Sequence, residues 1–168
     1  MRAICTLLAS MAVLTATAAT PLSYIPVSYI KTHLPDREVQ CLAKNIYFEA
    51  RNQDEYGKFG VAQVTLNRVD SPRFPDSICK VVFQPSKLPK KRHLCQFSWY
   101  CDGIPDRIRN KIQYEESKRI AILAILHRDR DITGGATHYH ASYVRPWWAK
   151  KLERTVKLGD HIFYRERR

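Results

Sequence analysis

One carboxylate stands out in this sequence because it interrupts an apolar helical pattern. Glu49 lies between Phe48 and Ala50, in a chain with 28 Lys and Arg residues against 16 Asp and Glu. At about 100° per residue, it falls at the edge of the stripe that contains Leu42 and Ile46. Apolar neighbours remove water from a carboxyl group and so raise its pKa. A Glu that stays protonated near neutral pH can give its proton to a leaving oxygen, as in glycosidases.

A structural interpretation competes with this one, because Glu49 could pair at the surface with Arg51, Gln53 or a lysine.

Two amide side chains could accompany a catalytic Glu. Gln63 and Asn67 are i, i+4 neighbours in the next helical pattern, so they project in the same direction. We expect both to face a cleft.

The segment from Cys95 to Gly103 places aromatic and polar side chains between two cysteines. Its aromatic residues could form a platform for sugar rings: Phe97, Trp99 and Tyr100. Its polar residues could fix the orientation of a ligand: Gln96, Ser98 and Asp102. The alternative is a small core closed by a disulfide.

Two aromatic candidates lie nearer the C-terminus. Tyr139 sits in a strand pattern between His138 and His140, and two histidines at i, i+2 point the same way. They could suit a metal, but no third ligand and no H-E-x-x-H motif is evident, so we expect neither a metal nor another cofactor. Trp147 follows Pro146, where an indole ring is compatible with a ligand wall or with core packing.

The elements that would position these residues form an α+β pattern. Helices are expected over 36–50, with Asp36 as N-cap, over 57–69, and from Pro105-Asp106 to about Arg130. Residues 70–105 look irregular. Short strands are expected over 137–143, 155–158 and 161–165, with Gly159-Asp160 as a turn.

The bulk composition indicates one exported domain. Residues 1–18 read as a signal peptide, with an uncleaved membrane anchor as the alternative; 19–35 form a lead-in segment and 36–168 the functional domain. The net charge of +12, or +11 without Arg2, favours anionic partners. We expect a periplasmic or secreted monomer.

Four cysteines remain after the leader, and an even number in an exported chain predicts two disulfides of open pairing. They are Cys41, Cys79, Cys95 and Cys101. An exported, disulfide-bonded chain also makes nucleic acid an unlikely partner, and no nucleophile motif of the G-x-S-x-G kind is present.

Seven segments, in order, resemble the SleB-type cell wall hydrolases: NIYFEARN at 45–52, GVAQVTLNRV at 60–69, SPRFPDSIC at 71–79, CQFSWYCDG at 95–103, ATHYH at 136–140, PWW at 146–148 and GDHIFY at 159–164. The resemblance runs from about Asp36 to Tyr164. It implies a compact helical core like that of lysozyme and lytic transglycosylases, with a small antiparallel sheet near the C-terminus. It also implies cleavage of peptidoglycan between N-acetylmuramic acid and N-acetylglucosamine, with Glu49 as the catalytic residue.

The resemblance leaves the mechanism open at one point. Many relatives continue E-A-R with Gly and an acid, whereas Asn52 follows Arg51 here and neither Asp54 nor Glu55 aligns cleanly. One well-placed acid favours lytic transglycosylation. The alternatives are a hydrolytic muramidase, an N-acetylmuramoyl-L-alanine amidase, and a non-catalytic basic protein that binds the cell wall.

Overall fold

The computed structural model describes residues 35–85 and 95–167. The predicted leader, nearly all of the lead-in segment and the basic run 87–92 lie outside them. The described part holds four α-helices, two 3-10 helices and three strands. Their bounds are α2 (Asp36–Ala50), α3 (Glu55–Asp70), α4 (Ile78–Val82), η1 (Ser98–Tyr100), α5 (Lys111–Leu126), β1 (His138–Ala141), η2 (Trp147–Lys151), β2 (Glu153–Leu158) and β3 (His161–Arg165).

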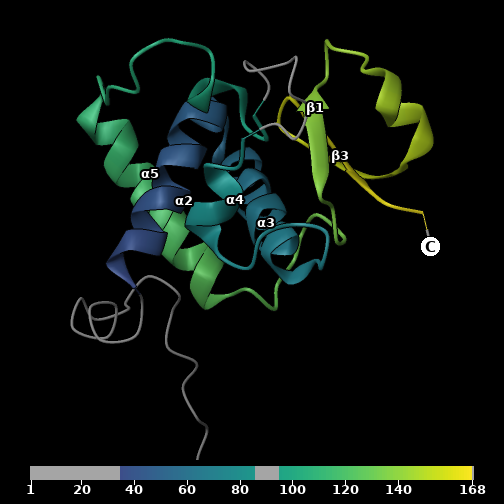
Figure 1. Ribbon diagram of the computed structural model, residues 1–168, viewed down its shortest axis with the longest axis horizontal. Coiled ribbons are helices and arrows are strands. Elements are labelled where there is room, and N and C mark those ends of the chain that lie inside the picture. The colour runs from purple at the N-terminus through teal and green to yellow at the C-terminus, as the bar shows by residue number, and fades with distance from the viewer. Residues whose placement is uncertain (1–34, 86–94, 168) are drawn as a thin grey trace, which may run out of the picture.

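The helices form one layer and the sheet lies beside it (Figure 1). Helix α2 packs between α5 and α3 in a core that excludes water from its apolar face. Leu42, Ile46, Val61, Leu66 and Ile120 are all essentially inaccessible to solvent. Because α2 is held on both flanks, the direction of its last turn is fixed, and that turn carries Glu49.

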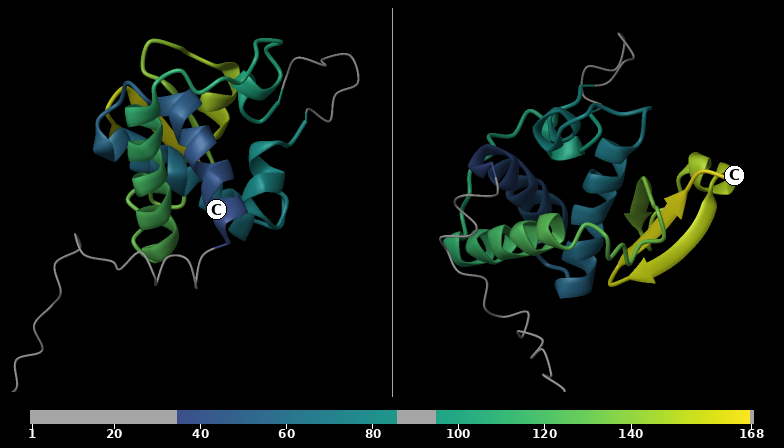
Figure 2. Two further views of the ribbon diagram at one scale, coloured as in Figure 1. Left: turned by 90° about the vertical axis from the view of Figure 1, so that its left-hand side faces the viewer. Right: turned by 90° about the horizontal axis from the view of Figure 1, so that it is seen from below.

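The sheet is antiparallel, with strand order β1-β3-β2. Its central strand faces α3 through Phe163, which packs with Val64 and Ala136 in a smaller core. A Cβ atom on Gly60 would lie 2.6 Å from Cζ of Phe163, so only glycine lets the helix and this ring approach so closely. Figure 2 shows the sheet standing at one side of the helical layer.

Two disulfides staple the described chain. Cys41 pairs with Cys79, which joins α2 to α4, and Cys95 pairs with Cys101 around η1, with Cα–Cα distances of 5.2 and 5.8 Å. The cysteine spacing alone had left this pairing open. No helix within the described ranges is long and apolar enough to cross a membrane.

The three long helices and the three strands were predicted with the correct type, but α4, η1 and η2 were not predicted, and several boundaries were wrong. Pro35 rather than Asp36 is the N-cap of α2, and its carbonyl accepts the first helical hydrogen bonds. Helix α5 starts six residues later than Pro105, because the Tyr47 hydroxyl accepts hydrogen bonds from the backbone N–H of Arg109 and Asn110. The region expected to be irregular contains α4 and η1.

Candidate active site

Glu49 and Tyr139 meet across the junction of the helical layer and the sheet. The Tyr139 hydroxyl donates a hydrogen bond of 2.8 Å to Oε2 of Glu49. Pairing with β3 sets Tyr139 opposite Phe163, and its ring packs against Phe163 and His161, at centroid distances of 5.7 and 5.1 Å. The tyrosine is therefore held by the strand register and by two rings, and the carboxyl of Glu49 receives a donor with a fixed position.

A buried cation stands behind this pair. Arg68 of α3 is only 4% exposed, and its Nε donates to the carbonyl of Thr137 at 2.8 Å. The guanidinium lies over two aromatic faces, 4.9 Å from the ring centre of Phe97 and 5.4 Å from that of Phe74. Its buried Nη1 has no hydrogen-bond partner among the described residues. Burial lowers the Arg68 pKa to about 10, so the group remains a cation at neutral pH.

Burial raises the pKa of Glu49, as expected from its apolar neighbours. The Tyr139 hydrogen bond and the Arg68 charge act in the opposite direction and lower the pKa in part, because both favour the carboxylate. Burial also raises the pKa of Tyr139 well above its usual value, so its hydroxyl keeps its proton and remains a donor. The pair thus combines a poorly hydrated carboxyl with partners that stabilise its charged form.

Arg51 and Gln53, which follow Glu49 in the chain, contact other groups and not its carboxyl. Arg51 lies over the Tyr47 ring at 5.5 Å, and Gln53 bonds to Asp160 in the turn between β2 and β3. The predicted alternative, in which Arg51 or Gln53 pairs with Glu49, is therefore wrong in this structure.

Neither Asp54 nor Glu55 is oriented as a partner of Glu49. Asp54 caps α3 by accepting from the N–H of Gly57 at 2.7 Å, and Glu55 pairs with Arg119 of α5 at 3.0 Å. No group that shifts the Glu49 pKa is a second carboxylate in the part of the chain described.

Gln63 and Asn67 do project the same way, but toward the loop between α5 and β1. Gln63 is 1% exposed; its amide donates to the Arg130 carbonyl and accepts from the N–H of Ile132. Asn67 donates to the carbonyl of Ala136 at 2.9 Å. The expectation that Gln63 faces a cleft is wrong, because burial and the backbone of the loop use both ends of its amide.

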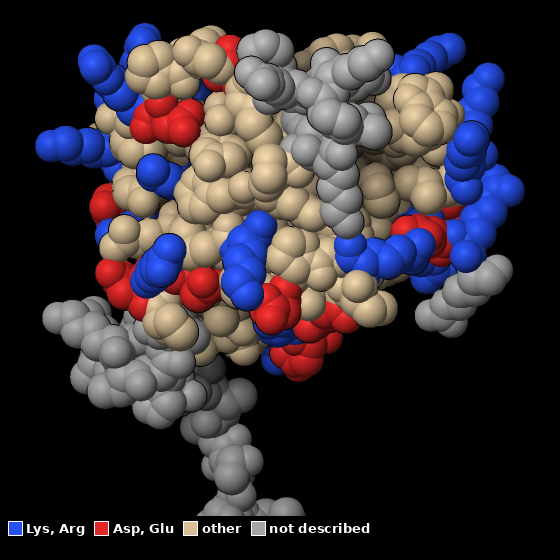
Figure 3. Space-filling view, in the orientation of Figure 1, with Lys and Arg blue, Asp and Glu red and all other residues tan. Residues whose placement is uncertain are grey.

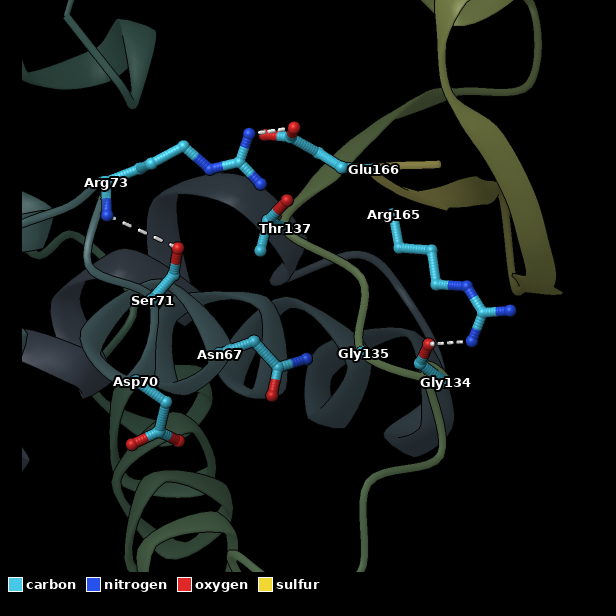
Figure 4. Close-up of a pocket in the computed structure, with 9 residues that line it drawn as sticks. All are labelled: Asn67, Asp70, Ser71, Arg73, Gly134, Gly135, Thr137, Arg165 and Glu166. Atoms are coloured by element: carbon cyan, nitrogen blue, oxygen red, sulfur yellow. Dashed lines mark hydrogen bonds and ion pairs between the residues drawn. The ribbon is translucent and has the colours of Figure 1, made fainter. Parts of the chain in front are cut away.

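Asn67 also lines a cavity of about 330 Å³ between the end of α3 and the segment 134–137. Figure 4 shows its amide pointing across this cavity toward the two glycines, Gly134 and Gly135. An ion pair between Arg73 and Glu166 spans one side. The charged side chains around this cavity are paired with other protein groups. We therefore interpret it as a structural contact between α3 and the segment 134–137, and not as a ligand site.

The cysteine-bounded segment divides into buried and exposed residues. Phe97 is buried beneath the Arg68 guanidinium, so it supports that cation and is not available as a sugar platform. Trp99 is mostly buried, stacks on Phe48 at 4.7 Å and donates through its indole N–H to Asn45. Gln96 and Ser98 are exposed.

Trp99 and Phe48 also form one wall of a cavity of about 570 Å³. It lies beside the end of α2, and Tyr47 and Arg51 contribute to the same wall. Phe48 and Glu49 are consecutive, so their side chains leave the helix about 100° apart. The lining of this cavity includes Trp99 from the predicted aromatic platform and the neighbours of Glu49 in the chain, but not Glu49 itself.

The two histidines of β1 point away from Glu49. His138 and His140 both pack on Trp148, at ring distances of 5.5 and 5.6 Å. Within the described ranges no three His, Cys, Asp or Glu side chains are grouped so as to hold a metal ion. Trp147, predicted as a possible ligand wall, is 74% exposed on this outer side of the sheet.

Sequence reasoning overlooked Arg68 and Asn45. Both are polar residues that fall within otherwise apolar helical stripes, the same signal that drew attention to Glu49. Asn45 is fully buried and connects Thr65 to Trp99. A search for every polar residue on a buried helix face would have found both.

This geometry resembles known proteins in sequence and in fold. The family model described as Cell Wall Hydrolase matches residues 52–164 and begins three residues after Glu49. A spore cortex-lytic enzyme of Halalkalibacterium halodurans is 32% identical over 129 residues, which cover 76% of this chain and 34% of that protein. The spore cortex-lytic enzyme of Bacillus subtilis is 29% identical over 131 residues, covering 76% and 37%. The chain thus spans little more than a third of either relative's length.

Solved structures agree with the fold. The catalytic domain of the Bacillus cereus SleB protein superposes with a TM-score of 0.58 at 27% identity, covering 78% of this chain and 91% of that domain. The catalytic domain of the germination-specific lytic transglycosylase SleB from Bacillus anthracis gives 0.55 at 25% identity, covering 79% and 98%. These matches confirm the predicted α+β, lysozyme-like class. Together with the family match over most of the described residues, they establish that this chain belongs to the cell wall hydrolase family.

Proposed function

We propose that the chain cleaves the glycan strand of peptidoglycan, between N-acetylmuramic acid and N-acetylglucosamine, as a lytic transglycosylase. The observation that carries the proposal is the desolvated Glu49 carboxyl with a raised pKa, hydrogen-bonded by Tyr139. A single carboxyl in this setting can act first as acid and then as base. Membership of the cell wall hydrolase family supports the substrate class.

The hydrogen bond from Tyr139 determines which oxygen acts. Because the hydroxyl donates to Oε2, that oxygen serves as acceptor and the acidic proton resides on Oε1. In the first step Oε1 gives its proton to the glycosidic oxygen, the bond from that oxygen to muramoyl C1 breaks, and positive charge develops at C1. The resulting carboxylate is stabilised by the Tyr139 hydroxyl and the nearby charge of Arg68.

The second step uses the substrate's own hydroxyl. The Glu49 carboxylate accepts the proton of the muramoyl 6-hydroxyl. At the same time the oxygen of that hydroxyl bonds to C1, which closes a 1,6-anhydro ring. The carboxyl is then protonated again and no water is consumed. The reaction is therefore complete with one protein carboxyl.

Hydrolysis would require a second carboxylate that this site lacks among its described neighbours. A retaining glycosidase places the second carboxyl about 5–5.5 Å from the first, and an inverting one roughly 6.5–9.5 Å away. The nearest candidates in sequence, Asp54 and Glu55, are committed to the α3 N-cap and to Arg119. This arrangement favours transglycosylation.

We assign sugar binding to the 570 Å³ cavity beside the end of α2. Phe48, backed by the mostly buried Trp99, offers aromatic surface for pyranose rings on the lining of this cavity, and Asp102 on the same lining can accept hydrogen bonds. Gln96 and Ser98 are exposed in the same cysteine-bounded segment but do not belong to this lining. Asn67 does not contact the sugar in this proposal. It holds the Ala136 carbonyl in the loop before β1, and so helps to position Tyr139.

The test is digestion of purified sacculi with product masses read by mass spectrometry. Transglycosylation predicts muramoyl products lighter by one water than those of a muramidase, with no free reducing end. Reducing-end products would replace transglycosylation by hydrolysis. Released peptides with intact glycan would indicate an amidase, and binding without any product would indicate a non-catalytic wall protein.

A further inference from the structure

A large cavity lies on the outer face of the sheet. Its volume is about 710 Å³, and it is formed where η2 folds back over β1 and β3. His140, Ile162 and Tyr164 contribute from the strands, and Val144, Pro146 and Trp147 from the connecting segment. The indole of Trp147 is 74% exposed, and Val144 is 43% exposed. Exposed aromatic surface at a cavity rim is typical of a binding surface.

The rim of this cavity is strongly basic. Arg145 and Lys150 line it, and neither forms an ion pair with any described residue. Lys151 lies over the Trp147 ring, with its Nζ 4.8 Å from the ring centre. Figure 3 shows Lys and Arg side chains gathered along the edge of the molecule where Figure 1 places η2 and the sheet. Across 141–158 the sequence holds five Lys and Arg residues, and Glu153 is the sole acid.

The cavity is separated from Glu49 by the sheet itself. Successive residues of a strand point to opposite faces, so Tyr139 and His140 project to opposite sides of β1. Tyr139 reaches Glu49 on the inner face, whereas His140 bonds to the Tyr164 hydroxyl at 2.9 Å and packs on Trp148 on the outer face. A ligand in this cavity is therefore distinct from the sugars at the carboxyl.

We infer that this cavity is a second binding site for peptidoglycan, which holds a strand segment away from the bond being cleaved. Sugar rings stack on Trp147, and carboxylates of the peptide stems pair with Arg145 and Lys150. The basic rim and the exposed indole support one occupant, a glycan strand that carries anionic peptide stems. The identity of the polymer rests on the proposed function, whereas the site itself does not require catalysis.

The experiment measures binding of the full chain to purified sacculi in the Glu49→Gln background, so that cleavage does not remove the ligand. Two variants test the site: Trp147→Ala, and the double change Arg145→Glu with Lys150→Glu. A matched double change, Arg37→Glu with Lys111→Glu, alters the net charge equally but at the starts of α2 and α5. We expect each site variant to weaken binding about tenfold and the control to weaken it less than about twofold.

Three outcomes would overturn the inference. Unchanged binding by both site variants would show that the cavity is not used. Equal weakening by the site and control double variants would indicate general attraction to charge. Equal loss of binding to an oligonucleotide by the site variants would indicate a nucleic-acid surface.

The same proteins with Glu49 restored separate this inference from the proposed function. Variants that bind sacculi poorly but process short soluble glycan fragments at the normal rate support the second site. Tight binding that depends on Trp147, with no cleavage by the chain carrying Glu49, would contradict the proposed activity and leave the second site standing.

Discussion

Replacing Tyr139 by Phe should slow the reaction and move its pH dependence in a defined direction. The change removes only the hydroxyl that donates to Oε2 of Glu49 at 2.8 Å. The ring contacts with Phe163 and His161 remain available to the phenyl group. The variant therefore isolates one hydrogen bond to the carboxyl.

The expected magnitude follows from the type of bond. A hydrogen bond to a charged group contributes about 1.5–3 kcal/mol. In the proposed mechanism the carboxylate is formed only as the proton leaves, so this contribution is lost in the transition state. At about 1.36 kcal/mol for each factor of ten, kcat/KM should fall by roughly 10- to 150-fold.

The sign of the pH effect follows from the same bond. Glu49 must be protonated to act as an acid, so kcat/KM falls as the pH rises through its pKa. The Tyr139 hydrogen bond lowers that pKa in the native protein. Its removal raises the pKa, and the alkaline limb of the profile should shift to higher pH.

The assay is kcat/KM on solubilised glycan strands across the pH range, with Tyr114→Phe as control. Tyr114 lies on α5 with its ring packed edge-on against Tyr47, at a centroid distance of 6.0 Å, and it is not among the groups that shift the Glu49 pKa. The control should leave the alkaline limb in place. A slower Tyr139→Phe enzyme with an unmoved limb, or a limb displaced to lower pH, would refute the reasoning.

Three further predictions concern the frame that holds the site. Gly60→Ala should destabilise the fold by about 1–3 kcal/mol, because the new Cβ would lie 2.6 Å from the Phe163 ring; thermal unfolding checks this, and an unchanged Tm would contradict it. Gln63→Ala should cost about 1–3 kcal/mol, because two loop backbone groups lose their hydrogen bonds to the buried Gln63 amide, each contributing about 0.5–1.5 kcal/mol. Unchanged stability in urea unfolding would refute the assignment of Gln63 to the loop. Replacing Cys41 and Cys79 by Ser should cost about 4 kcal/mol for a separation of 38 residues; the denaturation midpoint should fall, and an equal midpoint would contradict a structural role.

Local sequence patterns were sufficient for some of the site. The position of Glu49 at the edge of a buried helical stripe follows from the period of α2, and its desolvation follows from its neighbours. The common direction of Gln63 and Asn67 also follows from helix geometry. A helical pattern gives the direction in which a side chain projects, but it does not show which other segment that side chain contacts.

Contacts between distant segments decided the rest. Tyr139 is 90 residues from Glu49, and their hydrogen bond depends on how β1 docks against the helical layer through α3. The loop before β1 requires partners for its backbone, so Gln63 is used there and not in a cleft. The start of α5 likewise depends on a tertiary bond to the Tyr47 hydroxyl, which no local pattern records.

The most direct test of the central claim compares Glu49→Gln with Glu55→Gln in the release of glycan fragments from purified sacculi. Removing a general acid should lower the rate by about 10²–10⁴-fold. Glu55, exposed and paired with Arg119, provides a matched change at the next glutamate along the chain. The account predicts a nearly inactive Glu49→Gln protein and a Glu55→Gln protein close to the native rate; full activity of a folded Glu49→Gln protein would contradict it.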